Sequence, residues 1–325
     1  MALLELKDLH TFFRTKKGIV KAVNGVSYSV DEGKTLGVVG ESGSGKSVSA
    51  MSVLQLLDGN GYIDSGEILF DGVDLTKCSK DEMYAIRGND ISVIFQEPMT
   101  ALNPVFSVKR QLSEPFIIHR KMSKKEAAKA ALKMLSDVKI PNPEVVLNQY
   151  PHQLSGGMRQ RVMIAMALAC NPKLLIADEP TTALDVTIQA QILKLMNDLK
   201  EKTGTSIMLI THDLGVVAQM ADHVNVMYAG KVVETAPVFE IFKNPKHPYT
   251  KGLMASMPSL STGGERLETI EGNVPNPINL PEGCYFADRC PNCMEKCKKA
   301  QPKDVKVASR HHVSCFLYED EGGND

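Results

Sequence analysis

The stretch that decides the fold is Gly40-Glu41-Ser42-Gly43-Ser44-Gly45-Lys46-Ser47, which fits the phosphate-loop pattern G-x-x-x-x-G-K-S/T with an extra glycine inside. Glycines let the backbone curl so that successive N–H groups point at phosphate oxygens. Lys46 is expected to reach the β- and γ-phosphates, and the Ser47 hydroxyl to hold Mg²⁺. An apolar strand at residues 34–39 precedes the loop, and a helix that favours anions begins near Gly45. The stretch therefore predicts a nucleotide-binding site.

Outward from this loop, strand-like and helical segments alternate. Runs typical of strands lie at residues 19–30, 34–39, 67–70, 91–95, 174–177, 206–210 and 223–227. Residues 105–170 are helical in character, with a capping box at Ser123 and Glu126. Another helix is expected at residues 186–203, with Gly204 as its stop. The alternation predicts an α/β fold with a mainly parallel sheet and a helical insertion.

Two carboxylates close one of the apolar strands. Asp178 and Glu179 follow residues 174–177, Leu-Leu-Ile-Ala. A carboxylate at the end of such a strand binds Mg²⁺ in phosphate-loop enzymes, and a second one beside it can polarise the attacking water. With the phosphate loop upstream, the pair predicts nucleotide hydrolysis.

Composition excludes several classes of protein. The chain has 325 residues, which at about 150 per domain predicts about two domains. Its 37 basic and 38 acidic residues give a net charge of −1, without the basic excess typical of nucleic-acid binding. No apolar run approaches membrane-spanning length, and the charged start MALLELKDLH lacks the core of a signal peptide. We therefore expect a protein that works in the cytoplasm and binds no nucleic acid.

A second motif identifies a family. Residues 154–161, Leu-Ser-Gly-Gly-Met-Arg-Gln-Arg, resemble the signature sequence of ATP-binding cassette ATPases. The family's other elements follow its order: Gln96 after a strand, the signature, the two carboxylates, Ala183-Leu184-Asp185 and then His212. The resemblance covers about residues 3–233, and Met158 departs from the commoner glutamine. It implies an ABC-type nucleotide-binding domain with a mixed sheet core.

The resemblance also implies roles for individual residues in a two-subunit ATP sandwich. Glu179 would be the general base, His212 would contact the γ-phosphate, and Gln96 would sense Mg²⁺ and the attacking water. Asp185 would cross the dimer interface, and Phe13 would stack on adenine. The signature residues that would face the partner's ATP are Ser155, Gly156 and Gly157; a serine N-cap followed by exposed N–H groups suits an anion. The remaining nucleotide contacts would be Gly40, Ser42, Gly43, Ser44, Gly45, Lys46, Ser47 and Asp178.

The composition changes after about residue 236, where prolines become frequent. We predict an ATPase domain at residues 1–236, with a helical subdomain at about 97–170, and a small metal-binding extension at 237–325. Five cysteines crowd this extension, and in a reducing compartment such density favours a metal centre over disulfides. Thiolates suit zinc or an iron–sulfur cluster. The cysteines are Cys284, Cys290, Cys293, Cys297 and Cys315.

This extension resembles the C-terminal region of peptide and nickel importers, whose peptide members bind a [4Fe–4S] cluster. The matching positions are Cys284, Cys290, Cys297 and Cys315. Cys293 is extra and leaves the ligand set open, and Zn²⁺ or unliganded thiols are the alternatives. His311 and His312 are alternative ligands, but because they lie near a basic stretch they are expected to be solvated.

The resemblance implies the ATPase subunit of a dipeptide or oligopeptide importer on the cytoplasmic face of the membrane. Its partners would be two integral-membrane permeases, a second ABC ATPase (a related chain or a second copy) and an extracytoplasmic substrate-binding protein. Met99, Leu102 and Phe106 would line the permease groove or pack in the core. The alternative functions are a nickel importer ATPase, a soluble non-transport ABC ATPase, and an iron–sulfur redox protein with a vestigial nucleotide site.

Overall fold

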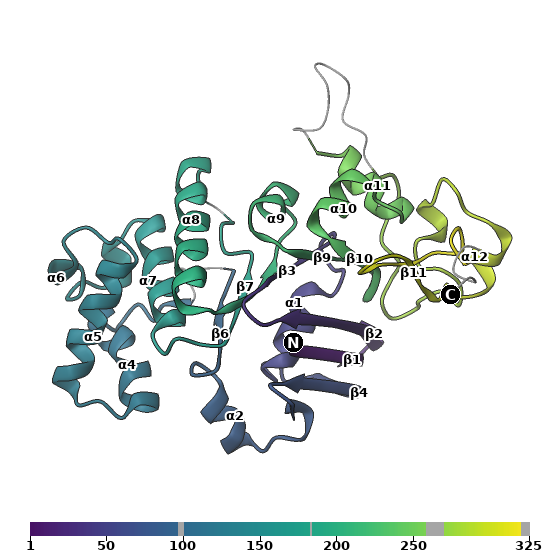
Figure 1. The fold of residues 1–325 in the computed structure, drawn as a ribbon. Coiled ribbons are helices and arrows are strands. Elements are labelled where there is room, and N and C mark those ends of the chain that lie inside the picture. Colours follow the sequence, from purple (N-terminus) through teal and green to yellow (C-terminus); the bar gives the residue numbers. More distant parts are fainter. Residues whose placement is uncertain (97–100, 183, 258–269, 320–325) are drawn as a thin grey trace. The chain divides into compact units, whose positions relative to one another are not determined.

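A computed structural model describes residues 1–96, 101–182, 184–257 and 270–319 (Figure 1). The chain divides into two compact units. The helical unit comprises residues 1, 31–34 and 77–209, and the phosphate-loop unit comprises residues 2–30, 35–76 and 210–325. No helix within the described ranges combines the length and apolarity needed to cross a membrane.

The N-terminal strands of the phosphate-loop unit form an antiparallel sheet of their own, in the order β2-β1-β4-β5. They are β1 (Ala2–Thr15), β2 (Gly18–Asp31), β4 (Gly61–Phe70) and β5 (Val73–Asp74). The prediction of a mainly parallel sheet was wrong for this part. Only two residues separate β1 from β2, and such a short connection permits antiparallel pairing alone.

The remaining strands of this unit are ordered β3-β9-β10-β12-β11. Here β3 (Thr35–Val39) is parallel to β9 (His223–Tyr228), and β10 (Lys231–Pro237) is antiparallel to β9. The cysteine-rich region contributes β11 (Asp304–Ala308) and β12 (His311–Ser314), and β12 pairs with β10. The helices are α1 (Lys46–Val53), α9 (Leu214–Met220), α10 (Val238–Lys243), α11 (Pro248–Ala255) and α12 (Glu295–Lys299). The extension thus adds two strands to the sheet that carries the phosphate loop.

The helical unit confirms the predicted strands, the helix at residues 186–203 and the helical character of residues 105–170, and it adds a helix at residues 80–86 that the sequence did not predict. Its strands are β6 (Ile91–Ile94) and β7 (Leu174–Asp178), which are parallel, and β8 (Ser206–Ile210), which lies beside β7. Both the capping box at Ser123 and the left-handed stop at Gly204 are confirmed. The helices are α2 (Lys80–Ile86), α4 (Val108–Arg120), α5 (Lys124–Asp137), α6 (Pro143–Val146), α7 (Gly156–Leu168) and α8 (Val186–Thr203).

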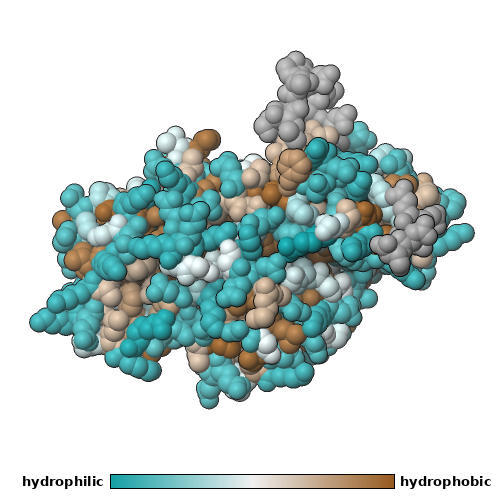
Figure 2. Space-filling view, in the orientation of Figure 1, coloured by the Kyte–Doolittle hydropathy of each residue, from teal (hydrophilic) through white to brown (hydrophobic). Residues whose placement is uncertain are grey.

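Apolar residues proposed to line a permease groove have mixed environments. Leu102 is buried in the core, as the alternative interpretation predicted. Phe106 is half-buried, with the Arg110 guanidinium 3.5 Å from its ring centroid. Met99 lies outside the described residues. On the face drawn in Figure 2, apolar side chains lie scattered among polar ones, which is ordinary for a protein surface.

The solvated environment predicted for His311 was wrong. His311 and Glu234 are both fully buried, and the His311 Nε2 lies 2.8 Å from a Glu234 carboxylate oxygen. Strand pairing of β12 with β10 brings the two residues together, although 77 positions separate them. Glu234 also accepts the N–H groups of Lys246 and His247 at 2.7 and 2.8 Å. Burial raises the pKa of Glu234, but the bonds from His311 and these N–H groups outweigh it and hold the pKa below its usual range.

Glu234→Gln is expected to lower the free energy of unfolding by about 2–3 kcal/mol, because it leaves buried donors without an acceptor. Since the pKa of Glu234 is lowered on folding, its stabilisation is present at neutral pH and is lost as the pH falls through that pKa. Urea unfolding at neutral and acidic pH measures both effects. The control is Asp304→Asn in the exposed pair with His312, which should cost under about 1 kcal/mol. Equal stabilities of the two variants at neutral pH would contradict the assignment.

Candidate nucleotide-binding and hydrolysis site

The phosphate loop follows β3, all five of whose residues are buried. Gly40 has φ 148°, and a Cβ there would lie 2.1 Å from the Met227 carbonyl oxygen. Gly45 has φ 94°, and its Cβ would lie 2.4 Å from the Ala22 carbonyl oxygen. Only glycine fits at either position, because any side chain would meet fixed backbone. The loop is therefore held close against neighbouring strands, with its conformation defined by packing.

Lys46 lies inside the loop. Its side chain is buried, and its Nζ donates hydrogen bonds to the carbonyl oxygens of Gly40 and Glu41 at 2.7 and 2.9 Å. Helix α1 begins at Lys46, and Ser47 is half-buried in its first turn. A curled backbone, an ammonium group and a helix N-terminus thus meet in one short segment, which suits a polyphosphate.

The two adjacent phenylalanines of β1 differ in exposure. Phe12 is buried, and its ring packs edge-on against Tyr62. Phe13 is half-buried and lies over Gly61, where an added Cβ would be 2.7 Å from the ring. Phe13 is therefore the more exposed of the two, and its contact with adenine stays a prediction.

In the helical unit, the structure brings together two residues that the sequence analysis selected separately. The Gln96 Nε2 donates to a Glu179 carboxylate oxygen at 2.8 Å. Thr182 Oγ1 donates to the same oxygen at 2.9 Å. Glu179 has φ 46°, an unusual backbone conformation for a residue other than glycine, while the neighbouring Asp178 is buried at the end of β7. Two hydrogen bonds thus orient the carboxylate; sequence reasoning missed Thr182, whose only signal is its position three residues after Glu179.

The signature residues begin helix α7. Ser155 is its N-cap, as expected, and its hydroxyl accepts the Met158 N–H at 3.3 Å. Gly156 is exposed, with no atom within 4 Å of an added Cβ, and Gly157 is half-buried. The buried Gln160 donates its amide to the Pro180 carbonyl oxygen. This bond, which the sequence did not reveal, joins the signature helix to the turn that carries Glu179.

Two further predicted site residues lie at helix starts. Asp185 is the N-cap of α8, where it accepts the Ile188 N–H at 2.9 Å, and the following Val186 is 83% exposed. His212 is exposed between β8 and α9, beside Asp213, the N-cap of α9. Their contacts with a partner subunit and with the γ-phosphate stay predictions, and Ala183 lies outside the described residues.

Four of the five C-terminal cysteines line one narrow cavity, and Cys293 is not among them. The Cys293 thiol lies 3.7 Å from the Met294 carbonyl oxygen and is hydrogen-bonded to the Cys297 side chain. Burial raises the pKa of the Cys284 thiol to about 11. Within the described ranges, no three His, Cys, Asp or Glu side chains stand close enough together to form a ready metal site. The four that line the cavity are Cys284, Cys290, Cys297 and Cys315.

Comparisons with known proteins agree with this geometry. Residues 23–182 match the family model described as ABC transporter, and residues 233–297 match that of the oligopeptide/dipeptide transporter C-terminal region. The chain is 53% identical to the oligopeptide transport ATP-binding protein AppD of Bacillus subtilis, over 98% of each chain. It is 54% identical to that organism's dipeptide transport ATP-binding protein DppD, over 97% of this chain and 94% of the relative. The dimeric ATP-binding cassette MJ0796 bound to ADP and Pi superposes with a TM-score of 0.65 at 30% identity, covering 72% of this chain and 98% of that one.

Proposed function

This chain belongs to the ATP-binding cassette transporter family as an ATPase subunit that energises oligopeptide or dipeptide import, and from that premise we propose its partners, its catalytic residues and its metal centre. The assignment to peptides rests on the match of residues 233–297 to the oligopeptide/dipeptide transporter C-terminal region. Together with the peptide-transport relatives, this match favours peptides over nickel as the cargo. We place the ATPase domain at residues 1–236, with its helical subdomain at about 97–170, and the extension at residues 237–325.

In the proposed reaction, the phosphate loop and Lys46 bind the β- and γ-phosphates of ATP. Glu179 accepts a proton from water, whose oxygen attacks the γ-phosphorus while the bond to the bridging oxygen breaks, giving ADP and phosphate. Gln96 and Thr182 support this role, because their hydrogen bonds hold the Glu179 carboxylate in one orientation. Mg²⁺, when bound by Ser47 and Gln96 together with Asp178, would neutralise charge on the phosphates. His212 would contact the γ-phosphate, Phe13 would stack on adenine, and Asp185 would cross the dimer interface.

For the extension we propose a [4Fe–4S] cluster held by four thiolates, with Zn²⁺ as the alternative. The soft chemistry of the donors suits the cluster, because four thiols line one cavity, and Cys293, whose side chain is hydrogen-bonded to that of Cys297, is not among them. Burial disfavours thiolates unless a cation compensates their charge, and burial raises the pKa of the Cys284, Cys290 and Cys315 thiols. Bound there, the cluster would cross-link four points of the chain. Its ligands would be Cys284, Cys290, Cys297 and Cys315.

We further propose that the working complex contains two integral-membrane permeases, a second ABC ATPase and an extracytoplasmic substrate-binding protein. The ATPase alone cannot carry cargo across a bilayer, so transport requires membrane chains. Exposed Val186 and the helix N-caps Ser155 and Asp185 support a subunit interface at the starts of α7 and α8.

A tagged chain purified from solubilised native membranes is expected to retain these four partners, identified by mass spectrometry. Membranes from an untagged strain are the control for proteins that adhere to the resin. The recovered binding protein is then screened for binding of peptides and of nickel. Recovery of ribosomal or DNA-bound proteins without membrane chains would contradict the importer.

A further inference from the structure

We propose that Arg289 of the cysteine-rich extension is a positioning residue of the nucleotide site, which neutralises and holds Glu41 of the phosphate loop. Arg289 donates from Nη1 and Nη2 to the two Glu41 carboxylate oxygens, at 2.9 and 3.1 Å. The Arg289 side chain is only 5% exposed, and that of Glu41 is 28% exposed. A bidentate pair with this little solvent contact is both geometrically specific and weakly screened.

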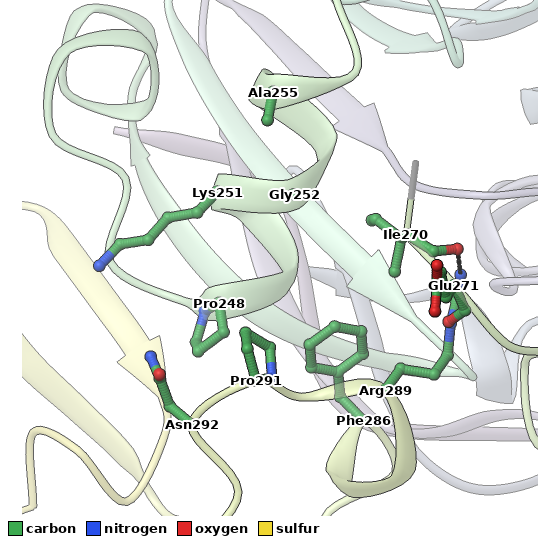
Figure 3. Close-up of a pocket in the computed structure, with 10 residues that line it drawn as sticks. All are labelled: Pro248, Lys251, Gly252, Ala255, Ile270, Glu271, Phe286, Arg289, Pro291 and Asn292. Atoms are coloured by element: carbon green, nitrogen blue, oxygen red, sulfur yellow. Dashed lines mark hydrogen bonds between the residues drawn. The ribbon is translucent and has the colours of Figure 1, made fainter. Parts of the chain in front are cut away.

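The guanidinium is fixed independently of the loop. Arg289 Nε donates to the Glu271 carbonyl oxygen and Nη2 to the Ile270 carbonyl oxygen, both at 3.0 Å (Figure 3). Nη1 also lies 3.3 Å from the Tyr228 hydroxyl. Because three other groups hold the guanidinium, it offers Glu41 an already oriented partner, and the loop loses little additional freedom in binding it.

A second bond ties the same loop residue to the C-terminal part of the chain. The Glu41 N–H donates to the Tyr249 hydroxyl at 2.8 Å. Tyr249 is fully buried and packs against Tyr228 and Phe286, with ring centroids 4.7 and 5.4 Å away. Backbone and side chain of Glu41 are thus both held by residues that lie at least 208 positions further along the sequence.

This arrangement has a consequence for nucleotide affinity. Glu41 is the second residue of the phosphate loop, so its carboxylate lies close to where the polyphosphate would bind. An uncompensated carboxylate there would repel the ligand, and a loop released from Arg289 would have to be ordered on binding. Arg289 neutralises the repelling carboxylate and keeps the loop ordered before binding, although it need not touch the nucleotide.

The inference extends to the metal centre, and this step rests on the cluster proposed above. Phe286 and Arg289 lie between Cys284 and Cys290 in sequence, and Arg289 directly precedes Cys290. A centre that fixes both cysteines would fix the segment that carries the guanidinium. We therefore expect the metal-depleted chain to bind nucleotide more weakly than the loaded chain, measured as a Kd and independently of turnover.

The test measures binding of the magnesium complex of a non-hydrolysable ATP analogue to the full chain by calorimetry. Arg289→Gln, which keeps an amide donor for the neighbouring carbonyls, is expected to raise Kd about tenfold at low ionic strength, equivalent to about 1.4 kcal/mol. The increase should shrink at high salt, which screens the repulsion from Glu41. The double variant Arg289→Gln/Glu41→Gln should regain most of the lost affinity, since it removes the repelling charge. Loss of a merely structural residue would not be rescued in this way.

Lys298→Ala is the matched control, because it removes an exposed cation of the same extension and should leave Kd unchanged. A wild-type Kd for Arg289→Gln, or a double variant as weak as the single one, overturns the proposal. Should Arg289→Gln not fold, Arg289→Lys serves instead: it keeps the charge but not the bidentate geometry, and should raise Kd roughly threefold. A wild-type Kd for Arg289→Lys then overturns the proposal. None of these outcomes bears on peptide import, which the membrane purification tests separately.

Discussion

Glu179→Gln is expected to lower the rate of ATP hydrolysis by about 10²–10⁴-fold while MgATP binding is retained. Glutamine has nearly the same shape as glutamate, and its amide oxygen can still accept the hydrogen bonds that Gln96 and Thr182 donate. It cannot accept the proton of the attacking water, so only the chemical step is lost. A variant that binds ATP without cleaving it should also accumulate the nucleotide-bound dimer.

Single-turnover hydrolysis and equilibrium binding, measured on the same preparation, separate the two effects. The control is Glu201→Gln, an exposed glutamate near the end of α8, for which hydrolysis should be unchanged. Turnover at the wild-type rate in Glu179→Gln would remove Glu179 as the general base. A parallel loss of binding would instead indicate that the carboxylate supports the nucleotide site itself.

Replacing one cysteine that lines the cavity is expected to abolish metal binding altogether. Chain purified anaerobically is expected to contain iron and acid-labile sulfide. Cys290→Ser should lose both, because serine removes one of the four soft ligands that line the cavity. Cys293→Ser should retain both, because Cys293 stands outside that cavity.

Comparing these two variants tests which cysteines bind the metal, because only two residues separate the proposed ligand Cys290 from Cys293. Bound zinc without sulfide in the wild-type chain would select the alternative metal with the same four ligands. Metal lost equally from both variants would contradict the ligand set. Wild-type chain that holds neither iron nor zinc would contradict the metal centre altogether.

The local sequence was sufficient to predict the structure wherever neighbouring residues determine it. The bounds predicted for β8 and α8 match the structure, because β-branched and apolar runs and a terminal glycine act within a few residues. The phosphate loop and the N-cap Ser155 were identified for the same reason. Gln96 and Glu179 could be selected together only through the resemblance to a family, since 83 positions separate them.

Tertiary structure decided the features that depend on long-range pairing. The antiparallel N-terminal sheet, the buried pair of His311 with Glu234 and the position of Cys293 outside the cavity that the other four cysteines line all belong to this class. The bond from Arg289 to Glu41 spans 248 positions, and neither residue carries a local signal of it. The sequence by itself determined the chemistry of this protein, a phosphate loop with paired carboxylates and a thiol-rich extension. Only the fold decided which of those groups meet, because burial and strand pairing bring distant side chains within hydrogen-bonding distance.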